Sequence, residues 1–210
     1  MRLRLILLSA AVVVPTSLLS GGWAVVTVEN PPERLVVGTP YTIEYSVRQH
    51  GKELLNGLRG SIEARAGAQV VRSDAKGLSG GKYTASLTVP SAGSWTITVN
   101  SGLGPSKTTM LPIAAAAAGA PAVATSELER GQHLFAAKGC AMCHVEAKVI
   151  PVDIRANKYD EKFVKQLLAD PAAMPKRYKA GVEMPNLNLK PAEISALAAY
   201  LAGTNSSGTR

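Results

Sequence analysis

The chain has 210 residues, of which 46% are hydrophobic and only 5% aromatic, so it can hold one or two small folded domains. Its formal charge is +8, but Arg2 and Arg4 lie in an N-terminal leader. The remaining sequence divides at Ser126 into a part with 9 basic and 6 acidic residues and a part with 12 basic and 9 acidic residues, so each carries +3. Neither part contains a long basic run, and we therefore expect no nucleic-acid surface.

The N-terminus has the pattern of a secretory signal peptide. Its first residues, MRLRLILLSAAVVV, place two arginines before a short apolar run that ends at Pro15. The run is shorter than the roughly 20 residues that a membrane-spanning helix needs. We predict a signal peptide over residues 1–24, with cleavage between positions 20 and 24. The mature protein would then be periplasmic or otherwise exported, and only an uncleaved leader would anchor it to a membrane.

Residues 25–113 are typical of a small antiparallel β-sandwich. Short segments rich in β-branched residues alternate with Gly and Pro turn signals. Two of them, 41–48 and 94–99, show the period-two alternation of a half-buried strand, and Trp95 is expected in the core. Other strands are predicted near 23–28, 58–65, 68–72, 82–89 and 107–113.

Beyond this segment the pattern changes to that of helices. Residues 114–126 are rich in alanine and lack charges and large side chains, which predicts a linker. Ser126 and Glu129 have the spacing of a capping box, so we expect a helix that runs to about Lys138 and ends at Gly139. Further helices are predicted over 160–169 and 191–203, and residues 204–210 are expected to form a flexible tail.

The strongest chemical signal is Cys140-Ala-Met-Cys143-His144, the signature of covalent c-type haem attachment. Two thiols three positions apart can reach the two vinyl groups on one edge of a porphyrin, and His144 would be the proximal iron ligand. A disulfide between the cysteines would close too small a loop to stabilise the fold much. A redox dithiol would need a thioredoxin-like βαβ context, which the sequence lacks.

A sixth iron ligand is expected from a methionine. Met174 and Met184 both precede proline, but Met184 lies 40 residues after His144, with enough chain to cross from one haem face to the other. Met142 lies inside the attachment loop and faces the wrong way. We therefore predict Met184 as the distal ligand, which would fill both axial positions and favour outer-sphere electron transfer over small-molecule chemistry.

Residues 127–203 resemble a class I cytochrome c domain. Gly131 and Phe135 resemble the family's N-terminal helix motif, and Leu197 and Tyr200 match its partner positions on the final helix. The resemblance implies an all-α fold in which these four residues pack where the two helices cross. It also implies that the carbonyl of Pro151 accepts the second ring proton of the proximal histidine. Ile150 departs from the glycine that the family often has before that proline.

Residues 80–99 resemble the immunoglobulin-like domains of FixH-type and YtkA-type periplasmic proteins. The resemblance implies an all-β immunoglobulin-like sandwich in an exported protein, associated with respiratory or metal-handling machinery. Copper-binding relatives use clusters of Met and His, whereas here His50 and Met110 are far apart in sequence. A histidine in a turn is ordinarily just solvated, so we expect no metal at His50.

Together these patterns predict a two-domain protein that carries one covalently attached haem c and exchanges electrons with redox protein partners, without a catalytic residue of its own. The sandwich would serve as a docking module. The alternatives are a subunit of a larger respiratory or dehydrogenase complex, and a haem sensor or peroxidase-like protein. Basic residues either surround the haem edge and steer an acidic partner, or are ordinary solvated charges: Lys138, Lys148, Lys176, Arg177 and Lys179.

Overall fold

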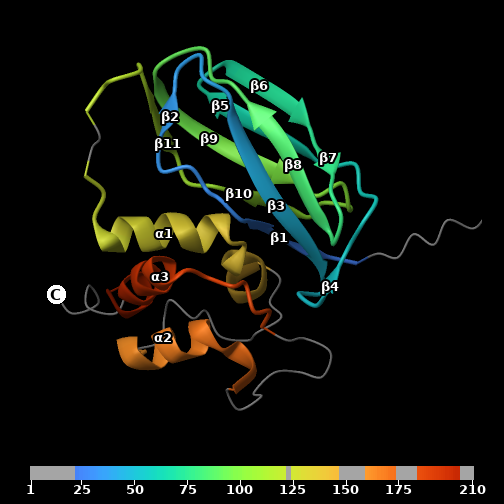
Figure 1. Ribbon diagram of the computed structural model, residues 1–210, viewed down its shortest axis with the longest axis vertical. Helices are drawn as coiled ribbons and strands as arrows, with labels where there is room; N and C mark the ends of the chain where they lie inside the picture. Colours follow the sequence, from blue (N-terminus) through green and yellow to red (C-terminus); the bar gives the residue numbers. More distant parts are fainter. Residues whose placement is uncertain (1–21, 122–123, 147–158, 174–183, 204–210) are drawn as a thin grey trace, which may run out of the picture.

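The computed structural model describes residues 22–121, 124–146, 159–173 and 184–203. Within these ranges a β-sandwich over residues 24–116 is followed by a helical region over 127–203 (Figure 1). Helix α1 (Glu127–Ala137) lies between the sandwich and helix α3 (Pro191–Gly203). The predicted two-domain fold, an all-β sandwich before an all-α domain, is confirmed. None of the helices in the described ranges is long and apolar enough to span a bilayer.

The first sheet has the spatial order β1-β3-β8-β7, with β4 added beside β3. All its pairs are antiparallel, and the register sets Tyr45 opposite Tyr83, whose rings stack with centroids 5.3 Å apart. Its strands are β1 (Ala24–Val28), β3 (Tyr41–Gln49), β4 (Glu53–Leu54), β7 (Lys76–Gly77) and β8 (Lys82–Leu87).

The second sheet has the order β2-β11-β9-β5-β6, with β10 beside β9. Its strands are β2 (Leu35–Val36), β5 (Ser61–Ala66), β6 (Gln69–Asp74), β9 (Gly93–Asn100), β10 (Lys107–Thr109) and β11 (Ile113–Ala116). Strand β2 pairs with β11 in parallel, and the other pairs are antiparallel. The order β1-β3-β8-β7 opposite β11-β9-β5 is the immunoglobulin arrangement of strands ABED and GFC.

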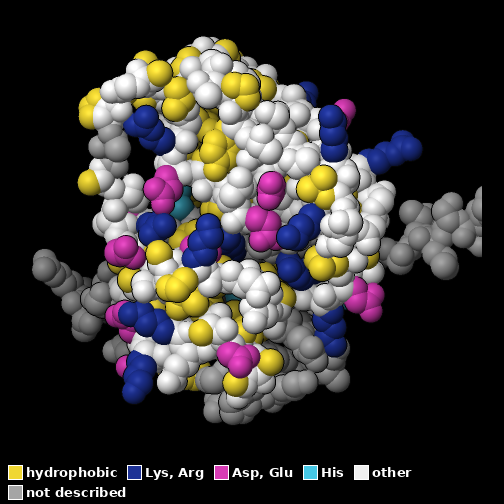
Figure 2. Space-filling model, viewed as in Figure 1, with side chains coloured by type: hydrophobic (Ala, Val, Ile, Leu, Met, Phe, Trp, Pro, Cys, Tyr) yellow, Lys and Arg dark blue, Asp and Glu magenta, His cyan; other side chains and the backbone are white. Residues whose placement is uncertain are grey.

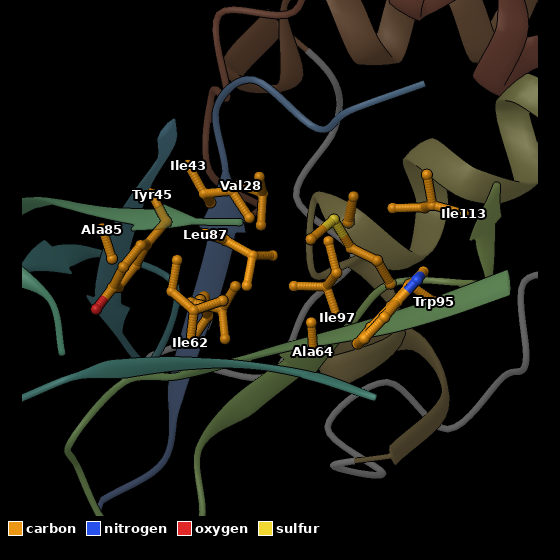
Figure 3. Close-up of a cluster of buried hydrophobic side chains, with 14 of the residues drawn as sticks. Val28, Ile43, Tyr45, Ile62, Ala64, Ala85, Leu87, Trp95, Ile97 and Ile113 are labelled. Atoms are coloured by element: carbon orange, nitrogen blue, oxygen red, sulfur yellow. The ribbon is translucent and has the colours of Figure 1, made fainter. Parts of the chain in front are cut away.

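The sandwich core lies between the two sheets. Figure 3 shows Ile43 and Tyr45 of one sheet and Ile62, Ile97 and Trp95 of the other pointing into the same space. Trp95 is fully buried, as predicted, and its indole N–H donates to the carbonyl of Ser91 over 3.1 Å. Every second residue of β9 from Trp95 onward is buried, which confirms the period-two pattern.

The helical region follows the predicted boundaries closely. Helix α1 has the expected capping box, in which the Ser126 hydroxyl accepts from the Glu129 amide and the Glu129 carboxylate accepts from the Ser126 amide. Helix α2 (Glu161–Ala169) begins after the N-cap Asp160. Two short turns complete the described part, a π-helical turn η1 (Met142–Glu146) and a 3₁₀ turn η3 (Pro171–Ala173).

One predicted boundary needs correction. The alanine run assigned to the linker begins as strand β11, because the backbone of residues 113–116 pairs with β9 on one side and β2 on the other. The leader over residues 1–24, with cleavage between positions 20 and 24, stays a prediction; Ala24 is the first residue of β1, is fully buried, and donates its N–H to the Ser106 hydroxyl over 2.9 Å. Residues 1–21 and the tail 204–210 lie outside the described residues.

Candidate haem-attachment site

The attachment segment begins where α1 ends. Lys138 is the C-cap, and Gly139 follows with a φ of +74°, a left-handed conformation that favours glycine. The Gly139 amide donates to the carbonyl of Ala136 over 3.1 Å, and the Met142 amide donates to the carbonyl of Gly139 over 3.1 Å. The chain therefore leaves the helix axis immediately before Cys140.

Cys140 and Cys143 are both half-buried and do not form a disulfide with each other. Burial raises the pKa of the Cys140 thiol to about 12 and that of the Cys143 thiol to about 11. Both would therefore be protonated as free thiols at neutral pH. A dithiol that works by thiol–disulfide exchange depends instead on a thiolate with a lowered pKa. The surroundings of the pair argue against that chemistry.

His144 follows Cys143 within the π-helical turn η1. Its imidazole is half-buried, and the Nδ1 atom itself is buried within the protein. Single π-helical turns occur frequently at functional sites, because they redirect side chains away from the regular helical path. Pro151, the expected acceptor for the histidine ring proton, lies outside the described residues.

Met184 packs on the same apolar cluster as the attachment segment, although it is 40 residues from His144 in sequence. Its half-buried side chain packs on the apolar cluster of the helical region, against which Cys140, Ala141 and Val145 also pack. Met142 instead lines a small cavity between the helical region and the sandwich strand β10. Met174, the alternative sequence candidate, lies outside the described residues.

These side chains fit a haem c group. Two cysteines that are not joined to each other supply the sulfurs for covalent attachment, and His144 supplies an imidazole nitrogen. Met184 adds a thioether beside the same apolar cluster. The cysteine pair would attach a haem c, and the imidazole of His144 and the thioether of Met184 are donor groups that could ligate its iron.

The helices that support this segment cross at Gly131. A Cβ built there would lie 1.9 Å from the carbonyl oxygen of Ala196 and 2.7 Å from the Cβ of Tyr200, so only glycine fits. One turn further, the rings of Phe135 and Tyr200 meet with centroids 5.6 Å apart. Leu197 is almost fully buried in the same cluster. The structure thus brings together all four residues that the sequence assigned to the helix crossing.

The remaining sequence candidates do not join this site. His50 is exposed in a turn with a φ of +52°, and Met110 is buried in the sandwich core. Within the described ranges, no three His, Cys, Asp or Glu side chains gather in a way that could hold a metal ion.

Lys138 fits neither of the two roles that the sequence left open for it, steering of an acidic partner or an ordinary solvated charge. Its side chain is only 3% exposed, and its ammonium lies 3.0 Å from the carboxylate of Glu193. Local sequence could not reveal this ion pair, because the Lys138 ammonium lies between the carboxylate of Glu193 on α3 and the carbonyl of Glu29 in the sandwich, both distant in sequence. The other four basic residues suggested for steering lie outside the described residues.

The comparison with protein families identifies the helical region. Residues 128–205 match the family described as cytochrome c. The match contains the cysteine pair, His144 and Met184. The C-terminal part of the chain is therefore a cytochrome c domain, a type of haem-binding electron carrier that typically lies outside the cytoplasm.

Comparisons with whole proteins give weaker likenesses. No curated protein matches the chain. A putative glycoside hydrolase from Bacteroides vulgatus is 14% identical with a TM-score of 0.33; the matched region is 42% of this chain and 17% of the hydrolase chain. The surface layer protein SbsC, domains 1–6, is 17% identical with a TM-score of 0.34; the matched region is 45% of this chain and 13% of the SbsC chain. The CARDB domain of a Pyrococcus furiosus protein, in complex with di-metal ions, is 11% identical with a TM-score of 0.29; the matched region is 45% of this chain and 89% of the CARDB chain. The chain thus spans less than a fifth of the first two proteins.

Proposed function

We propose that this protein is an exported c-type cytochrome with one haem, which passes single electrons between redox protein partners. Cys140 and Cys143 would attach the haem, and His144 and Met184 would be its axial ligands. The observation that carries the proposal is the convergence of the attachment segment and Met184 on one apolar cluster within the region that matches cytochrome c.

The residues of the chain have distinct tasks in this function. A bound haem c supplies one-electron chemistry between ferric and ferrous iron. The two cysteines would hold the group, and the Nδ1 atom of His144 is buried within the protein, away from solvent. Met184 would ligate the iron together with His144 and so keep substrates from the metal. The apolar cluster on which Met184 packs excludes water, and low water access is one of the properties that tune a reduction potential.

The ligand assignment is tested by comparing Met184→Ala with Met174→Ala. We expect Met184→Ala to abolish the methionine–iron charge-transfer band, to lower the reduction potential, and to let the ferrous protein bind carbon monoxide. Met174→Ala should leave all three unchanged. The reverse pattern would assign the ligand to Met174. Ready carbon monoxide binding by the unaltered protein would instead favour the sensor or peroxidase-like alternative.

The attachment itself has an independent test. Denatured protein extracted with acidified acetone should keep its colour, because the thioether bonds survive, whereas non-covalent haem would pass into the solvent. Replacing one cysteine by serine should leave one thioether and reduce the yield of mature protein. A colourless pellet from the unaltered protein would contradict the proposal.

The physiological context is supported by the leader and by the typical location of cytochrome c domains. The resemblance of the sandwich to FixH-type and YtkA-type domains also supports export. A lone monomer peak in size-exclusion chromatography of a native extract would favour a mobile carrier. Elution with a larger assembly would favour a subunit of a respiratory or dehydrogenase complex, with the sandwich as its docking module.

A further inference from the structure

The end of α1 is packed into the sandwich. Ala137 is almost fully buried and belongs to the hydrophobic core of the sandwich, not to that of the helical region. A Cβ at Gly139 would lie 2.4 Å from the carbonyl oxygen of Val26 and 3.3 Å from the hydroxyl of Thr108. Figure 1 shows this end of α1 beside β1 and β10. The two domains therefore meet backbone to backbone immediately before Cys140.

Buried polar contacts join the same elements. The Thr27 hydroxyl donates to the carbonyl of Lys138 over 3.3 Å, and the Lys138 ammonium donates to the carbonyl of Glu29 over 2.9 Å. The same ammonium pairs with Glu193, whose other carboxylate oxygen accepts from the Lys190 amide at the start of α3. One side chain thus links the sandwich, the end of α1 and the beginning of α3.

We call this set of contacts the domain interface. Its members on the sandwich are Val26, Thr27, Glu29 and Thr108, and those on the helical side are Ala137, Lys138, Gly139 and Glu193. At the margin, Arg130 and Glu33 form a further ion pair at 3.1 Å, but Glu33 is 75% exposed, and exposed pairs contribute little. Figure 2 shows basic and acidic side chains intermingled over the junction. The buried contacts must therefore provide most of the specificity with which the two domains bind each other.

Burial of an ammonium and a carboxylate is costly unless both are well paired. At the domain interface the ammonium has a carboxylate and a carbonyl as partners, and these come from different domains. If the sandwich moved away, Lys138 would lose the carbonyl of Glu29 and Thr27 would lose its acceptor. The arrangement therefore favours one orientation of the two domains over others.

We infer that the β1–β10 side of the sandwich is the binding surface for the cytochrome c domain of the same chain, and that Lys138 is a positioning residue that fixes the backbone two residues before Cys140. The sandwich is then an integral support of the attachment segment and not a freely tethered module. The inference does not rest on the proposed electron-carrier function, because every contact that carries it is made by residues of the chain.

The first experiment asks whether the domain interface holds without the linker. A specific protease site is inserted between Ala124 and Thr125, both exposed, and the purified full-length protein is cleaved there. We expect the two fragments to co-elute in size-exclusion chromatography at about 10 µM, as the uncleaved protein does. Separation of the fragments at that concentration would overturn the inference. Haem attachment is scored separately, by the colour of the helical fragment.

The second experiment asks whether Lys138 fixes the attachment segment. Hydrogen exchange is measured on the full-length protein for backbone amides of residues 139–145, for β1, and for α2. Lys138→Met should accelerate exchange in the first two regions by about tenfold or more and leave α2 unchanged. Lys138→Arg should restore much of the protection, because a guanidinium can donate to both the Glu29 carbonyl and Glu193. General destabilisation would not show this local pattern or this rescue.

The chain provides a matched control and a milder variant. Lys165 forms an ion pair with Glu161 at 2.6 Å on α2, but both side chains are about half exposed, so Lys165→Met should leave exchange in residues 139–145 unchanged. If Lys138→Met does not fold, Thr27→Val removes only the hydrogen bond to the Lys138 carbonyl while it keeps the shape of the side chain. Unchanged exchange of residues 139–145 in Lys138→Met would overturn the role of Lys138; if that variant does not fold, unchanged exchange in Thr27→Val would overturn the inference that the domain interface fixes this segment.

Discussion

The crossing of α1 and α3 at Gly131 allows a quantitative prediction. In Gly131→Ala, the new methyl group would lie 1.9 Å from the carbonyl oxygen of Ala196, whereas real Cβ contacts are not shorter than 3.0 Å. The neighbour is backbone and cannot rotate away, so the two helices must separate by about 1 Å. That separation loosens the packing of Phe135 against Tyr200 and of Leu197 below them.

Two opposing effects set the magnitude. Alanine is favoured over glycine inside a helix by about 1 kcal/mol. Overpacking of a close-packed site typically costs about 1–3 kcal/mol, and a clash with backbone belongs at the upper end of that range. The net loss in the free energy of unfolding should therefore be about 2 kcal/mol. For a chain of this size that corresponds to a fall in Tm of roughly 4–8 °C.

The assay is urea unfolding of the purified full-length protein, followed by circular dichroism, with thermal unfolding as a second measurement. Gly77→Ala is the control, because a Cβ at Gly77 meets only the Tyr83 ring at the ordinary distance of 3.8 Å, and its stability should change by less than about 0.5 kcal/mol. A Gly131→Ala variant as stable as the unaltered protein would refute the reasoning. It would mean that α1 and α3 do not approach each other as closely as described.

Three further results are expected. Ser126→Ala removes the hydroxyl that accepts from the Glu129 amide, and should lower stability by about 1 kcal/mol in the same urea assay. Trp95→Ala should lower the free energy of unfolding by about 3–5 kcal/mol, because Trp95 is fully buried. Trp23→Ala should lower it clearly less, because Trp23 is only half-buried. N-terminal sequencing of the exported protein should find a first residue at or before Ala24, because cleavage after Ala24 would remove the first residue of β1.

Local patterns in the sequence predicted the regular elements well. The capping box at Ser126 and Pro191 at the start of α3 each act within one helical turn, so these helix boundaries could be predicted without the rest of the chain. The alternation around Trp95 likewise reports which side of one strand faces the core. The pentapeptide from Cys140 to His144 is a local motif and was identified for the same reason.

Elements defined by distant partners could not be predicted in this way. Strand β2 has only two residues and exists because residues 35–36 pair with residues 115–116 at the other end of the sandwich. Alanine is a weak strand former, so β11 looked like linker until its partners on both sides were known. The burial of Lys138 has the same origin, because it depends on a carbonyl 109 residues away.

The composition of the segment between β11 and α1 does not by itself determine how the two domains are oriented. A ten-residue segment of small residues between β11 and α1 would by itself permit many relative orientations of the domains it joins. Its composition says nothing about what happens at its far end, where α1 returns to the sandwich and Ala137 enters the sandwich core. Because both ends of the segment are held, its composition does not set the domain orientation. A redox partner would then meet the attachment segment with the sandwich always at the same side of it, so the sandwich can restrict the direction of approach without contacting the partner.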